Sequence, residues 1–387
     1  MALKGIRVLE LAGLAPAPLC GAILADFGAN VIRVDKHNQM MSMDAMSHGK
    51  KSIALNLKSA KGVEVFKRMS KQSDVIIEPF RKGVMEKLGL GPDVLLKDNK
   101  KLIYARLTGY GQKGPLALKA GHDINYAAIS GVLSMLGRAN QQPTPPVNIL
   151  ADFAGGGLTC AFGIVMALLE RTRSGKGQVV DASMVEGAAY VSSWLFRSQW
   201  LPIWGKARGQ NVLDSGAHFY DTYETKDGGF MAVGSLEPLF YEELLKGLGF
   251  TDEEAPQNGS EEETQKVRKL FSDKFASKTK AEWTEIFEKL DACVTPVLSI
   301  DEATKYSHNK ERKTFVIDKY DLPVPNPAPV LSATPGISQA ATKLRPEIGQ
   351  HTREVMTEFG FSDSEITDIA QDGAAFVFED DQLNSKL

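Results

Sequence analysis

The sequence predicts an α/β protein with a large, doubly wound domain around a mostly parallel sheet and a second, smaller α+β domain. Over the first 110 residues, short runs of β-forming apolar residues alternate with stretches of helical spacing, which is typical of a parallel sheet covered on both faces. From about Asp221 this alternation gives way to charged amphipathic helices. A chain of 387 residues is long enough for two domains.

The elements of the large domain follow from these patterns in order. Strands are expected at 6–11, 31–34, 52–57, 74–78, 102–107 and 178–181, and helices at 16–27, 60–71, 123–136, 157–171 and 184–200. The first helix should end at Gly28, because glycine commonly terminates helices. Since crossovers between parallel strands are right-handed, an open Rossmann-like sheet is the predicted architecture.

The smaller domain is predicted from one strand, 230–233, and three helices, 238–248, 262–276 and 281–290. Five prolines between Leu322 and Pro335 predict an extended connector. The predicted limits are 1–200 for the large domain and 221–310 for the small one, with connectors at 201–220 and 311–334. The segment 335–387 is expected to pack back onto the large domain.

Composition argues against several classes of protein. A net charge of −3 offers no positive field for phosphate backbones, so nucleic acid is not an expected partner. The apolar run 158–169 is shorter than the roughly 20 residues that a membrane span needs, so it is interpreted as a buried helix and no membrane span is expected. Cys20, Cys160 and Cys293 lack metal-ligand spacing, which predicts free, mostly buried thiols and no bound metal.

The last three residues, Ser385-Lys386-Leu387, match a peroxisomal targeting signal, which a receptor reads as a free, flexible carboxyl end. A chance tripeptide on a polar tail is the alternative interpretation. The signal predicts a peroxisomal import receptor as a partner and the peroxisome as the location. A mitochondrial share of the protein stays open.

The turn after the first expected strand argues against a dinucleotide site. Such a site needs Gly-x-Gly-x-x-Gly, because only glycine lets the backbone approach a pyrophosphate closely. Leu11–Pro18 contains one glycine and two prolines, and proline removes backbone donors. A dehydrogenase is therefore not expected, and Asp35 is interpreted as a polar residue at a strand end.

Three places carry candidate chemistry. His122 follows a glycine-rich turn and begins an expected helix, Asp152 precedes the glycines Gly155–Gly157, and Glu237 stands at a strand-to-helix junction. Singly, such residues are more typical of helix caps and first-turn acids. Glycines entering a helix are costly, so close approach of a ligand or of another backbone is expected at Gly155–Gly157. His122 and Asp152 fall near likely strand carboxyl ends, where open α/β sheets bind ligands.

At these residues the chain resembles the α-methylacyl-CoA racemases, within the family III CoA-transferase superfamily. The resemblance extends over nearly the whole length. Besides the His122 and Asp152 segments, its markers are Leu24–Ala29, Arg106–Gln112, Gly175–Asp181, Tyr220–Tyr223 and Gly349–Thr352. The His122 segment separates the racemases from the transferases, which lack this histidine.

The resemblance implies an enzyme that interconverts (R)- and (S)-2-methylacyl-CoA thioesters through an enolate. His122 and Asp152 would be its two acid/base residues, His122 acting on the S substrate and Asp152 on the R substrate, with Glu237 as the partner of His122. Inverting a carbon acid does need a base on one face and an acid on the other. Backbone N–H groups at the start of the expected Asp123 helix are candidate donors to the enolate oxygen.

The resemblance also implies partners. The CoA moiety belongs to the substrate, so no separate cofactor is expected, and the family forms an interlocked homodimer. The CoA-binding positions implied by the resemblance are Lys36, Leu55, Asn56, Leu57, Lys58, Pro79, Phe80, Arg81, Lys82, Gly83, Gly121, Asp123, Ile124, Asn125 and Tyr126. Arginine is usual in the family where this chain has Lys36, and lysine keeps the charge but loses the bidentate fork.

Met40–Met46 contains four methionines, whose adaptable side chains suit branched acyl chains. Part of this segment is predicted to line the acyl groove, with a loop buried in a subunit contact as the alternative. Two other functions stay open. A CoA-transferase would use Asp152 as a nucleophile that forms an acyl anhydride, and a non-catalytic acyl-CoA-binding protein would use neither base. The preferred chain, pristanoyl-like or sterol-derived, also stays open.

Overall fold

The computed structural model describes residues 1–39 and 42–378. Two expectations, on Met40–Met41 and on Ser385–Leu387, concern residues outside this range. The chain forms two compact units. Unit 1 comprises Met1–Ser130, Pro146–Val191 and His308–Leu387, and unit 2 comprises Gly131–Pro145 and Ser192–Ser307.

Two stretches expected in the large domain, Gly131–Pro145 and 192–200, belong to unit 2. In the first, Nη2 of Arg138 lies 2.9 Å from Oδ1 of Asp221. In the second, the ring of Trp194 packs edge-on against that of Trp204, with centroids 6.1 Å apart. These contacts between residues distant in sequence explain why both stretches fold with the smaller unit.

The core of unit 1 is a seven-stranded sheet with the order β12-β3-β2-β1-β4-β5-β6. Its strands are β1 (Arg7–Leu11), β2 (Asn30–Lys36), β3 (Lys51–Leu55), β4 (Val75–Glu78), β5 (Ile103–Thr108), β6 (Val179–Ser183) and β12 (Ala375–Phe376). Strands β1 to β6 pair in parallel, and β12 is antiparallel to β3. This is the strand order of a Rossmann-like sheet with one added edge strand, so the predicted fold class is confirmed.

Helices cover both faces of this sheet. They are α1 (Pro16–Asp26), α2 (Ala60–Lys71), α3 (Val84–Lys87), α4 (Pro92–Asp98), α5 (Asp123–Ile129), the π-helix η2 (Ile149–Leu158), α6 (Thr159–Ser174), α7 (Met184–Val191), α14 (Gln339–Thr342), α15 (Thr352–Glu358) and α16 (Asp363–Gln371). Helices α1 and α6 lie against β1, β2, β5 and β6, and α2, α4, α15 and α16 pack on the other face. A short hairpin, β10 (Phe315–Ile317) with β11 (Pro323–Pro325), precedes α14.

Local sequence explains where these helices begin and end. Pro16 stands in the first turn of α1, where its missing N–H costs no hydrogen bond. The Oγ of Ser59 caps α2 by accepting from the N–H of Gly62 at 2.9 Å. The helix expected at 123–136 ends earlier, at Ile129, because Gly131 takes a φ of 87°. The helix expected at 184–200 is interrupted at Ser192.

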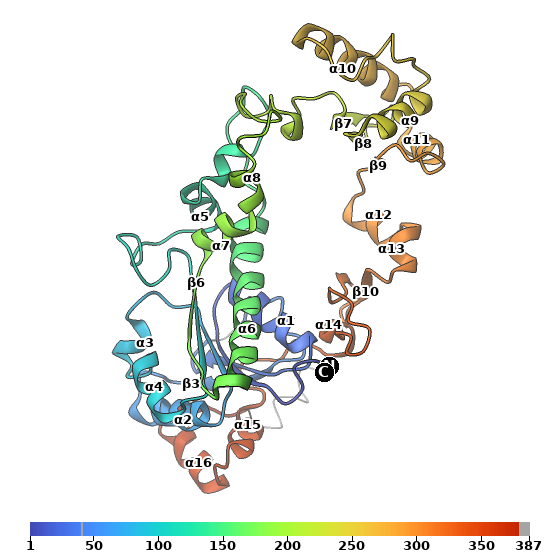
Figure 1. Ribbon diagram of the computed structural model, residues 1–387. Helices are drawn as coiled ribbons and strands as arrows, with labels where there is room; N and C mark the ends of the chain where they lie inside the picture. The colour runs from blue at the N-terminus through green and yellow to red at the C-terminus, as the bar shows by residue number, and fades with distance from the viewer. Residues whose placement is uncertain (40–41, 379–387) are drawn as a thin grey trace. The chain divides into compact units, whose positions relative to one another are not determined.

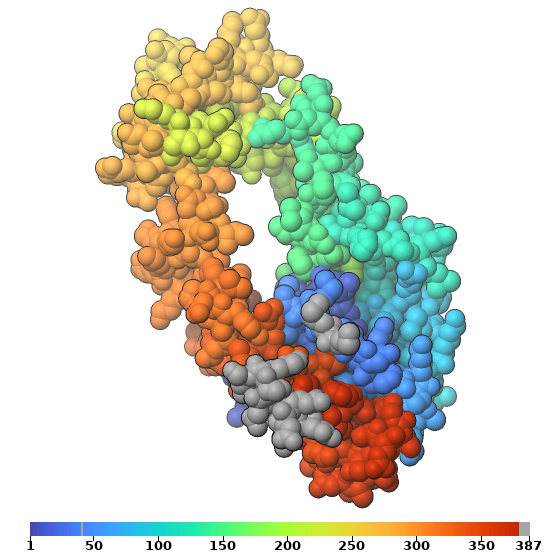
Figure 2. Space-filling model, turned by 180° about the vertical axis from the view of Figure 1, so that it is seen from behind, coloured from blue at the N-terminus to red at the C-terminus, as the bar shows by residue number. Residues whose placement is uncertain are grey.

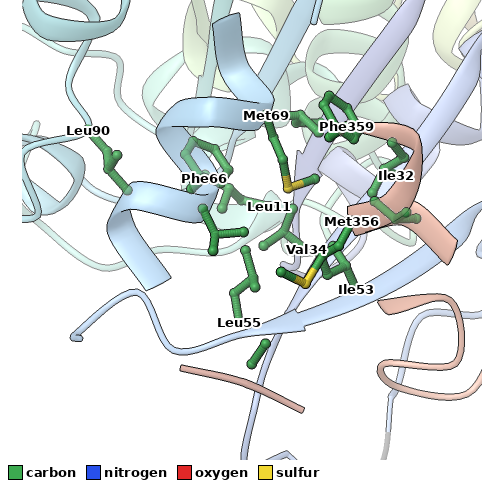
Figure 3. Packing of buried hydrophobic residues seen from close by; sticks show 14 of the residues in the cluster. Leu11, Ile32, Val34, Ile53, Leu55, Phe66, Met69, Leu90, Met356 and Phe359 are labelled. Carbon is green, nitrogen blue, oxygen red and sulfur yellow. The ribbon is translucent and has the colours of Figure 1, made fainter. Parts of the chain in front are cut away.

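The C-terminal segment completes the core of unit 1. Met356 of α15 and Phe359, which follows this helix, pack among Ile32, Ile53 and Met69, and none of the five residues is more than 1% exposed (Figure 3). Figure 2 shows the C-terminal helices beside the N-terminal segments that they cover. Strand β12 adds backbone pairing to β3. The C-terminal segment, through α15 and β12, is therefore an integral part of unit 1, the unit that also contains the N-terminal strands.

Charged side chains are also buried inside unit 1. Lys50 Nζ lies 2.8 Å from Oε2 of Glu10, and Arg33 Nε lies 2.9 Å from Oδ2 of Asp35. Burial raises the pKa of Glu10 to about 7, although Lys50 opposes the rise. Asp35 lies at the end of β2, as interpreted, and is its penultimate residue. Its side chain is 2% exposed, and the carboxylate also accepts from the Oγ of Ser52 at 2.6 Å.

The apolar run 158–169 was expected to be a buried helix, and it lies in the continuous helical stretch Ile149–Ser174, which is buried on one face only. Cys160, Ile164 and Ala167 are buried, whereas Phe162 and Leu169 are more than half exposed. Within the residues described, this is one stretch long and apolar enough to cross a membrane by length and composition, and 44% of its apolar window is buried inside the protein. Packing of its small residues against the sheet marks it as a core helix with an uncovered apolar stripe.

Unit 2 is a three-stranded antiparallel sheet covered by helices (Figure 1). Its elements are η1 (Val132–Met135), α8 (Ser193–Arg197), η3 (Val212–Asp214), β7 (Tyr220–Glu224), β8 (Phe230–Gly234), α9 (Pro238–Leu248), α10 (Glu261–Phe275), α11 (Lys280–Phe287), β9 (Val294–Pro296) and α12 (Ile300–Lys305). The following helix, α13 (Ser307–Glu311), belongs to unit 1 except for its first residue. Trp283, Phe271 and Phe275 are fully buried in its core. Capping boxes begin α10 and α11, which suits their exposed, charged faces.

Candidate active site

A cavity of about 690 Å³ lies in unit 1 at the carboxyl ends of the strands. The loop after β1 lines it with residues 13–16 and Pro18, and the loop after β4 lines it with Pro79–Arg81. Strands β1 and β4 are neighbours where the strand order of the sheet reverses. Open α/β sheets bind their ligands at this switch point, so the cavity has the position of a functional site.

His122 is brought to the cavity by the start of α5. Its backbone N–H donates to Oδ1 of Asn125 at 3.1 Å, and its carbonyl accepts from the N–H of Asn125 at 2.9 Å. These two bonds close the first turn of the helix and fix the backbone of the histidine. The side chain is exposed at the rim of the cavity, where it is accessible to a ligand.

Asp152 reaches the same cavity from η2. Its side chain is largely buried, at 7% exposure, and Oδ2 accepts from Nδ2 of Asn148 at 2.9 Å. Burial raises the pKa of Asp152, the Asn148 hydrogen bond opposes the rise, the charge of Asp123 adds to it, and His122 lowers the pKa slightly. A carboxyl with a raised pKa is better suited than an ordinary aspartate to exchange protons near neutral pH.

Asp123 links these two segments. Its side chain is 3% exposed, and Oδ2 accepts from the backbone N–H of Ala151 at 2.7 Å and from that of Asp152 at 2.9 Å. The carboxylate therefore faces the first turn of η2 and is turned away from solvent. Helix α5, which begins at His122, is hydrogen-bonded through this side chain to the helix that carries Asp152.

The glycines after Asp152 allow helices to pack backbone against backbone. A Cβ at Gly155 would lie 2.4 Å from the nitrogen of Ala188 in α7, and a Cβ at Gly157 would lie 2.7 Å from the carbonyl oxygen of Pro16 in α1. Of the two causes that the sequence left open, close approach of another backbone is the one observed. The π-helical turns of η2, a form often found at functional sites, are held between α1 and α7.

Tyr126 forms one wall of the cavity. Its ring packs against Gly109 and Gly121, where a Cβ would lie 2.1 Å and 2.6 Å from ring atoms. It meets Tyr110 edge-on, with ring centroids 5.0 Å apart, and its hydroxyl donates to the carbonyl of Gly121. Burial raises the pKa of Tyr126 to about 12, with Asp152 and Tyr110 contributing, so the phenol stays protonated and acts as a fixed donor.

The predicted CoA-binding positions divide into two groups. Pro79, Phe80, Arg81, Gly121 and Tyr126 line the cavity together with His122 and Asp152. The others lie outside its lining: Lys36, Leu55, Asn56, Leu57, Lys58, Lys82, Gly83, Asp123, Ile124 and Asn125. Most of the second group also follow strand carboxyl ends.

Several of these outer positions have structural contacts of their own. Leu55 is 2% exposed and belongs to the core. The backbone N–H of Asn56 donates to the carbonyl of Ala374 at 2.8 Å. Lys36 is exposed at the end of β2. Glu237 belongs to unit 2, where it is exposed and precedes the first turn of α9.

Of the methionine segment, Met43–Met46 line the cavity, and Met40–Met41 lie outside the residues described. Oδ1 of Asp44 accepts from the N–H of Met46 at 2.8 Å, and Oδ2 lies 3.4 Å from Nη1 of the buried Arg33. The loop is therefore anchored to the domain interior by a charge, which leaves the side chain of Met43 exposed at the cavity.

The lining residues that the predicted site did not include comprise, among others, Tyr110, Lys119, Asn148 and Met184. Two signals could have found them. Asn148 stands four residues before Asp152, a spacing that places two helical side chains on one face. Lys119 lies in the loop between β5 and α5, which leads from a strand end to His122.

A Rossmann-like sheet whose switch point holds a histidine, a buried carboxylate and a tyrosine defines the chain as an α/β protein with acid–base groups in a ligand cavity. The chain belongs to CoA-transferase family III, whose family model matches residues 3–352. It is 55% identical to the alpha-methylacyl-CoA racemase of Mus musculus and 54% identical to that of Homo sapiens, each over 387 residues that cover both chains completely.

The fold is similar to that of a solved CAIB/BAIF family protein from Brucella suis. The TM-score is 0.78 with 22% sequence identity, over 92% of this chain and 99% of that chain. This likeness supports the fold alone.

Proposed function

We propose that the chain is a racemase that interconverts (R)- and (S)-2-methylacyl-CoA thioesters by proton transfer at the α-carbon. The observation that carries the proposal is that His122 and Asp152, brought from two helices, line one cavity. The full-length identity of 55% to a protein named as such a racemase supports the substrate class. The preferred acyl chain is a 2-methyl-branched one, as in branched-chain fatty acids and bile acid-type side chains.

The reaction needs two groups that exchange roles with its direction. His122 removes the α-proton of the S substrate while Asp152, protonated, delivers a proton to the opposite face. In the reverse direction Asp152 removes the proton of the R substrate and His122 returns one. The raised pKa of Asp152 supports its protonated role, because an ordinary aspartate is almost fully ionised at neutral pH.

The intermediate is an enolate whose oxygen needs hydrogen-bond donors already in place. The first turn of α5 supplies backbone N–H groups that have no acceptor within the helix, beside His122. The CoA arm brings its own phosphates, and Arg81 and Lys119 place cations at the same cavity. No cofactor beyond the CoA of the substrate takes part in this scheme.

Three further parts of the proposal rest on family resemblance and on the printed sequence. Glu237, supplied by unit 2, partners His122 and favours its charged form. The protein acts as an interlocked homodimer. Ser385-Lys386-Leu387 directs it to the peroxisome through the import receptor.

The test is hydrogen exchange at the α-position. The protein is incubated with (S)- and with (R)-2-methylacyl-CoA separately in D₂O, without an acceptor acid, and the α-position is followed by NMR. Racemisation predicts deuterium entry from both enantiomers and convergence on one mixture. His122→Ala should suppress exchange more from the S side and Asp152→Asn more from the R side, while His308→Ala, a change at an exposed histidine, serves as the control.

A transferase would behave differently. It would show no exchange without acceptor, but would transfer CoA once a free carboxylic acid is added, with Asp152 as its nucleophile. That result would overturn the proposed function.

A further inference from the structure

The start of η2 lacks the cap that helices usually take from their own sequence. Its first turn presents backbone N–H groups that need acceptors. Asn148, the preceding residue, has a left-handed φ of 63° and its side chain does not cap the helix. Its side-chain amide, through Nδ2, instead donates a hydrogen bond to Oδ2 of Asp152 at 2.9 Å. An acceptor for the N–H groups must come from elsewhere in the fold.

Asp123 is that acceptor. Both hydrogen bonds from the first turn of η2, at 2.7 Å and 2.9 Å, end on its Oδ2. The side chain comes from another helix and lies 28 and 29 residues away in sequence from its two donors. Asn148 is thereby left to hold the side chain of Asp152, so the backbone and the carboxyl group of one residue are fixed by two different partners.

The position of Asp123 gives this bond a second consequence. Asp123 follows His122 directly, and one of its two donors is the N–H of Asp152 itself. A single carboxylate thus joins the backbones of the two residues that face one cavity. Charged hydrogen bonds to backbone N–H groups are among the stronger ones in proteins, and this one is shielded from solvent.

We propose that Asp123 is a positioning residue whose carboxylate fixes the spacing of His122 and Asp152 on either side of the substrate α-carbon. The inference rests on the proposed two-base function and adds a residue to it. It differs from the role that family resemblance implies for Asp123, that of a CoA-binding residue, because the side chain faces η2 and does not line the cavity.

The charge of Asp123 supports the inference independently of the hydrogen bonds. It raises the pKa of Asp152 beyond the effect of burial, against the opposing influences of Asn148 and His122. From the same helix Tyr126, whose own pKa is raised to about 12, stays neutral. Helices α1, α6 and α7 also pack against η2, and Glu186 on α7 is exposed. Asp123 is therefore the anion that acts on Asp152 from within the protein.

The experiment compares Asp123→Ala and Asp123→Asn with wild type by the exchange reaction in D₂O. Asp123→Ala removes both hydrogen bonds and should lower kcat for both enantiomers about 100-fold, because misplacement of a catalytic group by about 1 Å has an effect of this size. KM should change only a few-fold, since the side chain does not line the cavity. A CoA-binding role would instead raise KM.

Asp123→Asn separates positioning from charge, and it remains informative if Asp123→Ala does not fold. The amide oxygen can still accept both N–H groups, so kcat should recover most of its wild-type value. The negative charge that raises the pKa of Asp152 is lost. In the pH profile of the exchange rate for the R substrate, the low-pH limb should therefore move to lower pH. Ser362→Ala removes a side-chain cap from α16 in the same unit, and should lower stability without altering either the pH limb or the ratio of kcat to KM.

A folded Asp123→Ala variant with the kcat and pH profile of wild type would overturn the inference and leave the proposed function intact. An Asp123→Asn variant whose pH limb does not move, or moves upward, would also overturn it. If the wild-type protein shows no exchange, both the proposed function and this inference are wrong. The wild-type protein is measured first, so that outcome is distinguished from a failure of the inference alone.

Discussion

The side-chain amide of Asn148 donates to Oδ2 of Asp152 at 2.9 Å from a backbone held at a φ of 63°. Asparagine tolerates this left-handed conformation better than most residues, because its short polar side chain can hydrogen-bond locally. Asn148, which lines the cavity, therefore combines a left-handed backbone conformation with a side-chain hydrogen bond to Asp152.

Replacing Asn148 should move the titration of Asp152. The hydrogen bond lowers the pKa of Asp152, so Asn148→Ala should raise it and shift the low-pH limb of exchange from the R substrate to higher pH. This direction is opposite to that expected for Asp123→Asn. Asn148→Gly loses the same bond but accommodates the backbone, so it should show the same pH shift with about 1 kcal/mol less loss of stability. If the low-pH limb of the exchange rate is unchanged in both variants, the hydrogen bond from Asn148 does not lower the pKa of Asp152.

Glu78 should make the stability of the protein depend on pH. Its carboxylate accepts from Nε of Arg106 and from the N–H of Phe80, which lies in the loop that lines the cavity after β4. Burial raises its pKa from 4.5 to about 7, against the opposing charge of Arg106. The folded state therefore holds a proton that the unfolded state releases, and this contribution is present below pH 4.5 and lost as pH rises through 7.

The measurement is denaturant unfolding of wild type and of Glu78→Gln between pH 4.5 and 8. The difference in free energy of unfolding, wild type minus variant, should fall by about 3 kcal/mol across that interval. Using the difference cancels the titration of all other groups. A difference that stays flat or rises with pH would contradict the buried state of Glu78.

Gly187 should tolerate no side chain. A Cβ there would lie 1.8 Å from the carbonyl oxygen of Gly155, so Gly187→Ala must separate α7 from η2. We expect a loss of about 3 kcal/mol in the free energy of unfolding, at the upper end for overpacking, with a further loss of activity because Asp152 lies on η2. Gly163→Ala in α6 is the control, since its Cβ would meet only a side-chain methyl of Val180 at 3.1 Å. Equal effects of the two changes would argue against close packing as the reason for the glycines.

Lys119 should contribute to binding of the CoA phosphates. It lines the cavity and is exposed, so Lys119→Ala should raise KM about fivefold, which corresponds to about 1 kcal/mol for an exposed charge. The value of kcat should change little, and the effect should shrink at high salt. Lys113→Ala, an exposed lysine outside the lining, is the matched control. A fall in kcat with unchanged KM would point to a different role.

The sequence was informative where one local pattern decides the structure. Alternating strands and helices predicted the sheet, and Pro238–Leu248 was predicted with the bounds of α9. Residues far apart in sequence were harder to assign. The place of Asp35 near the end of β2 was predicted, whereas its hydrogen bond with Ser52 depends on the pairing of β2 with β3.

The same limit applies to the site. His122 and Asp152 were accessible from motifs, whereas the role of the Asp123 side chain depends on the packing of α5 against η2, which no periodicity encodes. Lys119 and Tyr110 were missed because the loops that carry them have no regular pattern.

The pairing of β12 with β3 has a consequence for how the protein is made. Residues 352–376 are synthesised long after strands β1 to β3, yet they supply side chains without which these strands keep an apolar face uncovered. Most of unit 2, 192–307, is synthesised before them and can fold as a unit. Unit 1, although it contains the first residues of the sequence, therefore completes its core only after residues 352–376 have been synthesised, and nascent chains truncated before residue 352 should remain bound to chaperones.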